Sequence, residues 1–256
     1  MSSKVLIVIP VYNEFERFNV EYFNQLSSKA KQRSDFLFVD DGSTDESLDL
    51  IRDLCSRNDK YGYLALPTNR GKSEATRMGM LKGFELGYSA VGFLDADGAF
   101  EVNDVVRIID VYLEKCKSVG NWDSVWSSRL SISGRKIVRN GKRHFVGRLL
   151  SHLICLFMED APWDTQSGLK IYKGEERLLL ILQHPFKTKW FFELEMLQRY
   201  VRMFGVSLQI WEEPVDAWTD VKGSKIRFRH APSIILEMTF IICTNVKIFT
   251  MSLRGN

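Results

Sequence analysis

The sequence predicts an α/β fold with a mostly parallel β-sheet flanked by helices. In the first half, short runs rich in Val, Ile, Leu, Phe and Tyr alternate with longer segments that suit helices, which is the pattern of such a sheet. The chain has 256 residues, of which 45% are hydrophobic and 26% charged, a composition typical of a globular protein. This length predicts one large domain, or one domain with an appendage.

Five strands are predicted in the first half. Each is a short run of aliphatic, β-branched or aromatic residues, and they cover residues 4–11, 35–40, 63–67, 90–95 and 124–129. Helices fill the gaps between them. Ser43 and Glu46 have the spacing of a capping box for a helix that runs through Cys55, and a second helix is predicted over residues 72–86.

After residue 129 the regular alternation ends. Residues 131–144 are typical of a loop, and an apolar helix is predicted over residues 145–158. Ligands of open α/β sheets bind beyond the carboxyl ends of the strands. We therefore expect the second half to be an elaboration built over that edge of the sheet.

Net charge and cysteine content exclude several classes of protein. The 35 Lys and Arg outnumber the 32 Asp and Glu by only three, which is too small a bias to indicate nucleic-acid binding. The four cysteines have no CxxC pair and no metal-ligand spacing, which predicts reduced thiols in a cytoplasmic protein. They are Cys55, Cys116, Cys155 and Cys243.

Neither end of the chain predicts a membrane-spanning helix. The N-terminus has only a short apolar run that ends at Pro10, unlike a secretion signal. The apolar stretch at 233–253 is interrupted by Glu237 and Lys247, which leave nine uncharged residues between them. An interfacial helix is the alternative for this stretch.

Polar clusters directly follow four of the predicted strands. They are Tyr12-Asn13-Glu14, Asp40-Asp41, residues 69–72 and Asp95-Ala96-Asp97. Because the carboxyl ends of parallel strands share one edge of a sheet, these clusters are expected to meet there. A turn followed by a helix cap is the alternative interpretation of DDGSTD, but four clusters in register favour a ligand-binding edge.

The nature of this edge follows from what it contains. It has neither a GxGxxG fingerprint nor a phosphate-binding GxxxxGK[ST] motif. Asp95 and Asp97, at the end of an extended strand, direct both carboxylates to the same side, where their oxygens can hold Mg²⁺ or Mn²⁺ against a diphosphate. A sugar nucleotide is therefore a natural ligand.

Four motifs, VIPVYNE, VDDGSTD, NRGKSEATRMG and the strand-terminal DAD, carry a family resemblance. In order and spacing, over about residues 5–98, the chain resembles the inverting family 2 glycosyltransferases of the GT-A (Rossmann-like) fold. The resemblance implies that Asp95 and Asp97 hold ribose and metal, so that the metal neutralises the leaving nucleoside diphosphate. It also implies that the donor pocket is lined by Pro10, Tyr12, Glu14, Asp41, Lys72 and Asp95.

The second half narrows the resemblance. DTQSGLKIY at 164–172, FFELEML at 191–197 and WTDVKGSKI at 218–226 resemble the branch that glycosylates dolichyl or polyprenyl phosphate, and most of all the dolichyl-phosphate β-glucosyltransferases. This implies transfer of a hexose, with UDP-glucose favoured as donor, to a polyprenyl phosphate for glycan or cell-surface polysaccharide assembly. It also implies a cytoplasmic protein with peripheral contact at the cytoplasmic membrane face.

The same resemblance predicts how the chain is divided. A GT-A domain covers residues 1–232, with a nucleotide-sugar half at 1–129 and an acceptor half at 130–232. The expected C-terminal elaboration belongs to the acceptor side. Residues 233–256 form an apolar helix that is expected to associate with a membrane.

Two basic stretches without acidic residues agree with a phosphate acceptor. Residues 129–148 contain seven Lys or Arg, and residues 222–229 contain four. The alternatives are a solvated loop and a patch that rests on anionic lipid headgroups. We expect the acceptor phosphate to be held by Arg129, Arg143, Arg148 and Lys225.

Glu193 and Leu194 distinguish between acceptors. By resemblance, they stand where many family 2 enzymes that glycosylate a hydroxyl have a Glu-Asp pair, whose Asp is the general base. A phosphate is already ionised and needs no base. Glu193 or Glu195 is still a candidate base, and capping or pairing near a helix start is the alternative for both. The candidate catalytic residues are Asp95, Asp97, Arg129, Asp164 and Glu193.

Two other functions are compatible with the sequence. One is a family 2 transferase that acts on a sugar hydroxyl of a surface polysaccharide or of a lipid-linked oligosaccharide. The other is a nucleotide-sugar-binding protein without turnover. The complete set of DAD and Lys72 argues against the second.

Overall fold

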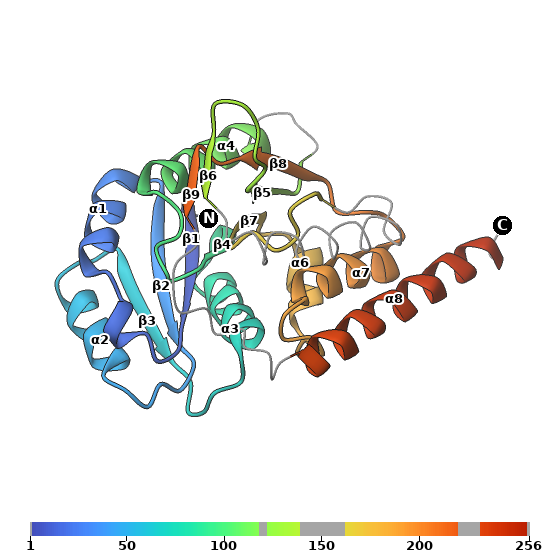
Figure 1. Ribbon diagram of the computed structural model, residues 1–256, viewed down its shortest axis with the longest axis horizontal. Helices are drawn as coiled ribbons and strands as arrows, with labels where there is room; N and C mark the ends of the chain where they lie inside the picture. The colour runs from blue at the N-terminus through green and yellow to red at the C-terminus, as the bar shows by residue number, and fades with distance from the viewer. Residues whose placement is uncertain (1, 118–121, 139–161, 220–230, 255–256) are drawn as a thin grey trace.

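A seven-stranded β-sheet lies at the centre of the computed structural model, with helices on both of its faces (Figure 1). The structure describes residues 2–117, 122–138, 162–219 and 231–254. Within these ranges the strand order is β3-β2-β1-β4-β7-β5-β8, and a separate ribbon pairs β6 with β9. The strands are β1 (Ser2–Val11), β2 (Ser34–Asp40), β3 (Tyr61–Ala65), β4 (Tyr88–Leu94), β5 (Ser124–Ser128), β6 (Lys136–Val138), β7 (Leu169–Lys173), β8 (Ile210–Pro214) and β9 (Ala217–Thr219).

The strands β1 to β4 run parallel, whereas β7 runs antiparallel to both of its neighbours, β4 and β5. The pair of β5 and β8 is parallel again. The described helices are η1 (Phe15–Arg17), α1 (Val20–Ala30), α2 (Ser47–Ser56), α3 (Lys72–Glu85), α4 (Val102–Lys117), α6 (Glu176–Leu182), α7 (Phe192–Phe204) and α8 (Ala231–Arg254).

Both faces of the central parallel strands β1, β2 and β4 are buried, which explains their nearly continuous apolar sequences. In β1, Val5 and Ile7 belong to the core on the side of α1, α2 and α4, while Leu6 and Val8 belong to the core on the side of α3, α6, α7 and α8. On that second side, a Cβ at Gly79 would lie 2.4 Å from Cγ1 of Val8, so only glycine allows α3 to pack this closely. This close packing holds α3 against β1.

The strand order reverses between β1 and β4, because β2 and β3 lie on one side of β1 and β4 lies on the other. Such a point is where open α/β sheets bind ligands. Pairing of β1 with β2 continues to Val11 and Asp40, but pairing with β4 ends at Val8 and Phe93. Pro10, which has no N–H to donate, follows on that unpaired side. The two strands therefore separate just before the DAD segment leaves β4.

The structure confirms the α/β class and the five predicted strands, with small shifts at their ends. The capping box is wrong: Ser43 Oγ accepts a hydrogen bond from the backbone N of Asn13, and α2 begins only at Ser47. The segment predicted as a loop contains β6. One sheet spans the boundary predicted at residue 129, because β7 and β8 complete it. The helix predicted over residues 145–158 lies outside the described residues.

The predicted apolar C-terminal helix corresponds to α8, which packs against α7 and extends beyond it (Figure 1). Met238 and Ile241 of α8 are buried in the core, while Ile235 and Leu236 are exposed. Among the described helices, none is both long enough and apolar enough to cross a bilayer.

Candidate active site

The loops that follow β1 and β2 are joined by hydrogen bonds. The backbone N of Asn13 donates to Ser43 Oγ at 2.9 Å, and the backbone N of Thr44 donates to Asn13 Oδ1 at 2.7 Å. The backbone N of Glu14 donates to Ser47 Oγ at 2.8 Å. Asn13 has a φ of +47°, in the left-handed region that Asn tolerates better than most residues. The two loops thus form one unit at the carboxyl edge of the sheet.

Asp41 sets the start of α3. Its Oδ1 accepts a hydrogen bond from the backbone N of Arg70 at 2.8 Å, and its Oδ2 accepts one from Gly71 at 2.7 Å. Burial raises the pKa of Asp41, although these two hydrogen bonds oppose the shift. Gly71, with a φ of +95°, is the N-cap of α3, so Lys72 is the first helical residue. Asp41 therefore positions Lys72, and its contact with a donor stays a prediction.

Lys72 and Asp95 form an ion pair, with 2.5 Å between Nζ and Oδ1. Burial opposes the charge of Lys72, but the carboxylates of Asp95 and Glu193 outweigh it, so the pKa of Lys72 lies above its usual value. The backbone N of Asp95 donates to the Gly168 carbonyl at 2.9 Å. A Cβ at Gly168 would come within 2.4 Å of Asp95 Oδ2, so this glycine makes room for the carboxylate.

Asp97 completes the acidic pair. Burial and the neighbouring charge of Asp95 raise the pKa of Asp97, and its Oδ1 accepts a hydrogen bond from the backbone N of Ala99 at 3.1 Å. A divalent cation can neutralise the repulsion between two carboxylates in a partly buried site. Asp95 also holds Lys72, so Asp97 is the better candidate of the two for binding such an ion.

The residues present fit a metal that is shared with a ligand. In the part of the chain that the structure describes, no three His, Cys, Asp or Glu side chains converge into a complete metal site. Mg²⁺ is commonly bound by one or two carboxylates together with substrate phosphates and water. Asp95 and Asp97 supply that kind of half-site at the end of β4.

Sequence reasoning missed two residues near Asp97. Arg17 in η1 forms an ion pair with Glu14, with Nη2 2.7 Å from Oε1, and its positive charge lowers the pKa of Asp97 against the larger effect of burial. The ring of Tyr22 in α1 lies beside Gly98. Burial and the charge of Asp97 raise the pKa of Tyr22. The one sequence signal is the three-residue spacing of Glu14 and Arg17, which suits a helical ion pair.

Arg129 and Asp164 form a bidentate pair. The distances are 2.8 Å from Nε to Oδ2 and 2.7 Å from Nη2 to Oδ1, and the backbone N of Arg129 also donates to Oδ2. The Arg129 guanidinium lies 5.0 Å from the centroid of the Trp218 ring. Trp218 in turn forms an isolated β-bridge with Phe100, which lies just after the DAD segment. Arg129, predicted to hold the acceptor phosphate, and Asp164, predicted as a catalytic residue, are therefore one unit close to the DAD segment.

Both glutamates of the FFELEML segment are engaged within the chain. Glu193 Oε1 accepts a hydrogen bond from Lys170 Nζ at 3.0 Å. Glu195 Oε2 accepts hydrogen bonds from the backbone N atoms of Lys187 and Thr188, each at 2.9 Å. Leu194 between them is buried in the core. The segment thus has the pairing near a helix start that was the alternative to a general base.

The structure brings together residues predicted to bind donor and metal where β1 and β4 separate, and it places Arg129 and Asp164 next to them. Pro10 lies near the end of β1 with Tyr12 just after it, and both are half-buried. Arg143, Arg148 and Lys225 lie outside the described residues, so their predicted contacts stay predictions. The residues that lie together are Glu14, Asp41, Lys72, Asp95 and Asp97, and their roles in binding donor and metal stay predictions.

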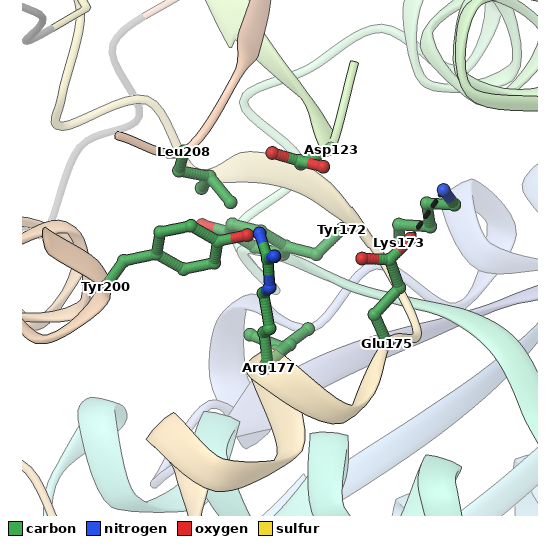
Figure 2. Close-up of a pocket in the computed structure, with 8 residues that line it drawn as sticks. Asp123, Tyr172, Lys173, Glu175, Arg177, Tyr200 and Leu208 are labelled. Carbon is green, nitrogen blue, oxygen red and sulfur yellow. Dashed lines mark ion pairs between the residues drawn. The ribbon is translucent and has the colours of Figure 1, made fainter. Parts of the chain in front are cut away.

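A separate small cavity lies at the opposite edge of the sheet, where β5 begins and β7 ends (Figure 2). Its volume is about 10 Å³, which suits a single water molecule. Figure 2 shows Arg177 beside Tyr200, and the ion pair of Lys173 with Glu175 at its rim. None of the predicted site residues lines this cavity, so it is not part of the candidate active site.

The chain is similar to curated and solved proteins over most of its length. Residues 6–155 match the family described as glycosyl transferase family 2. The dolichyl-phosphate β-glucosyltransferase of Saccharomyces cerevisiae is 29% identical over 86% of this chain and 68% of its own length. That of Mus musculus is also 29% identical, over 88% of this chain and 70% of its own length.

Two solved structures share the fold. Glucosyl-3-phosphoglycerate synthase from Mycobacterium tuberculosis, in complex with Mn²⁺, UDP and glucosyl-3-phosphoglycerate, gives a TM-score of 0.60 at 16% identity, over 96% of this chain and 80% of that chain. The mannosyltransferase PcManGT from Pyrobaculum calidifontis, in complex with GDP-Man and Mn²⁺, gives a TM-score of 0.55 at 13% identity, over 99% of this chain and 76% of that chain. Because the family match covers more than half of the chain, and the fold agrees with it, this protein belongs to glycosyltransferase family 2.

Proposed function

We propose that the protein transfers glucose from UDP-glucose to a polyprenyl phosphate of the dolichyl type, with inversion at the anomeric carbon and with Mg²⁺ or Mn²⁺ as cofactor. The similarity to dolichyl-phosphate β-glucosyltransferases over most of this chain supports the glucose and the acceptor. The Mn²⁺ and UDP bound to a protein of the same fold support the metal and the base.

The observation that carries the acceptor class is the engagement of both FFELEML glutamates. Glu193 is paired with Lys170, and Glu195 is occupied by the loop that precedes α7 and by Arg199. A hydroxyl acceptor must lose a proton and needs a base close to it. A phosphate monoester reacts through an oxygen that is already ionised, so it needs no such base.

The reaction is a single displacement. An oxygen of the acceptor phosphate attacks the anomeric carbon of the sugar, the bond from that carbon to the β-phosphate oxygen breaks, and its electron pair leaves with UDP. Lys72, fixed at the start of α3, places its charge beside the diphosphate. A divalent ion held by Asp97 and Asp95 supplies further neutralisation of the leaving group when it is bound.

The acceptor phosphate is held from the other side. Asp164 and the face of Trp218 orient Arg129, so that its planar guanidinium lies at the end of β5. Arg143, Arg148 and Lys225 complete the phosphate site in this proposal. Positioning of donor and acceptor, together with charge neutralisation, then accounts for catalysis.

The lipid acceptor is reached from the cytoplasmic membrane face through α8. Ile235 is 63% exposed and Leu236 is 70% exposed. Glu237, the one charged residue between positions 232 and 245, points to the protein and accepts hydrogen bonds from the backbone N atoms of Lys189 and Trp190. The outer face of α8 in this range is therefore uncharged, as an interfacial helix requires on its membrane side.

Radiolabel transfer tests the proposal. UDP-glucose, UDP-galactose, UDP-GlcNAc and GDP-mannose are each incubated with the protein, with and without polyprenyl phosphate and Mn²⁺. We expect an acid-labile lipid product from UDP-glucose that depends on both additions. The acceptor assignment would be overturned if a donor turned over without label entering the lipid phase and the label were transferred to a glycan hydroxyl instead.

A further inference from the structure

Lys170 on β7 is a charged residue inside the core, with 0% of its side chain exposed. Its cross-strand neighbours are Phe93 on β4 and Trp126 on β5. The ammonium lies 4.3 Å from the ring centroid of Trp126 and 5.5 Å from that of Phe93. Burying a charge is costly unless it is paired, so this position calls for an explanation beyond packing.

The partner of Lys170 is Glu193, which is itself almost completely buried. Lys170 Nζ donates to Glu193 Oε1 at 3.0 Å and to the Thr165 carbonyl at 2.7 Å. Glu193 Oε2 is buried and has no hydrogen-bond partner among the described residues. Replacing such a pair by apolar residues of similar volume is often neutral or stabilising. Stability alone therefore does not account for its presence.

Glu193 connects Lys170 to the donor edge. Lys72 Nζ lies 5.5 Å from the Phe93 centroid, the same distance as Lys170 Nζ, so the two ammonium groups share one aromatic neighbour. The carboxylate of Glu193 adds to that of Asp95 in favouring the charged form of Lys72. Charges of alternating sign thus run from β7 through α7 to the end of β4.

We propose that Lys170 is a positioning residue for the donor diphosphate site. It holds the Glu193 carboxylate in place, and this fixed negative charge keeps the Lys72 ammonium at the diphosphate position beside Asp95. Lys170 does not touch the substrate, and Glu193 acts as a charge rather than as a base. The inference rests on the donor site proposed above.

Two variants and the wild type test this role. Lys170→Met keeps a long side chain that packs well against aromatic rings, but leaves Glu193 buried without its cation. The double variant Lys170→Met/Glu193→Gln removes both charges. Affinity for UDP with Mn²⁺ is measured by calorimetry, the donor KM by transfer assays at saturating acceptor, and Tm by thermal unfolding.

We expect Lys170→Met to lower Tm and to weaken UDP binding about tenfold, equivalent to about 1.4 kcal/mol, with a parallel rise in donor KM. In the double variant Tm should recover, because no unpaired charge remains buried. UDP affinity should stay low, because the double variant has no carboxylate at position 193 to act on Lys72. The acceptor KM should stay close to the wild-type value in both variants.

Recovery of both Tm and UDP affinity in the double variant would show that the pair is structural only, and would overturn the proposal. So would a loss of Tm in Lys170→Met with unchanged UDP affinity. UDP binding needs no acceptor, so the outcome is independent of the proposed lipid substrate. A wild type that binds UDP with these variant effects but transfers no glucose would refute the function and retain the role of Lys170.

Discussion

Lys72 and Asp95 join the first turn of α3 to the end of β4, with 2.5 Å between the ammonium and the carboxylate. Each partner is fixed by a different segment. Asp41 accepts hydrogen bonds from the residues just before Lys72, including Gly71, and Gly168 borders the carboxylate of Asp95. Changes at this pair and its supports should therefore affect the donor before they affect the acceptor.

Asp97→Asn should lower transfer by at least about 10²-fold, because the proposed metal ligand and its charge are lost. The pKa of Asp97 is raised, so its ionised form costs stability at neutral pH, and the variant should unfold at the same or a higher temperature without metal. Mn²⁺ with UDP should raise Tm of the wild type and not of the variant. Normal turnover in Asp97→Asn would refute the metal assignment.

Gly168→Ala should weaken donor binding, because the new Cβ would come within 2.4 Å of Asp95 Oδ2 and displace the carboxylate from Lys72. Donor KM is the measurement, with acceptor KM as the internal reference. Gly62→Ala is the matched control, since its Cβ would meet only the Leu37 side chain at 3.4 Å. Equal donor KM values for the two variants would contradict the steric argument.

Arg129→Lys should raise the acceptor KM about tenfold and leave the donor KM nearly unchanged, because lysine cannot replace the bidentate pair with Asp164. Steady-state kinetics at varied polyprenyl phosphate measures this. Arg177→Lys, at the cavity on the opposite edge, is the control and should have no effect on either KM. An effect on the donor KM alone would assign Arg129 to the donor side of the site instead.

Glu74→Gln should lower the free energy of unfolding at pH 7 by about 1–3 kcal/mol. Glu74 and Arg77 form a buried bidentate pair, and Arg77 also donates to the Leu182 carbonyl, which ties α3 to α6. The pair lowers the pKa of Glu74, so its contribution is present above the usual value of 4.5 and is lost as pH falls below it. In urea unfolding, the difference in unfolding free energy between wild type and variant should be smaller at pH 3.5 than at pH 7. A difference that stays constant would contradict this prediction.

Leu236→Asp should reduce binding to liposomes, because it puts a charge on the apolar outer face of α8. Flotation with anionic liposomes is the measurement. Leu86→Asp is the matched control, since Leu86 is a 56% exposed leucine at the end of α3. Binding that is unchanged in both variants would refute the membrane role of α8.

The donor half could be predicted from sequence because its signals are local. The apolar runs of β1, β2 and β4 are buried on both faces, and polar residues such as Asp41, Asp95 and Asp97 follow them directly along the chain. Strand type and strand end together place these residues at one edge. The start of α3 at Lys72 follows from Gly71 in the same way.

The rest depends on contacts between distant segments. Arg129 and Asp164 are 35 residues apart, and nothing near either one indicates the other. Lysine is rarely buried, so Lys170 makes its short segment look exposed and polar. The sequence therefore does not indicate that this segment is a central strand. Ser43 has the type and spacing of a cap, but its hydroxyl is taken by Asn13 from another loop. Such pairings become visible only when the fold is known.

The position of β7 has a consequence for how the protein is made. This strand lies between β4 and β5, yet about 75 residues of chain separate the end of β4 from the start of β7. During synthesis the edge of β4 therefore stays unpaired until β7 has left the ribosome, so the nascent chain exposes a strand that other chains can join. Folding intermediates should be captured by chaperones at this stage, and a fragment that stops after β5 should aggregate.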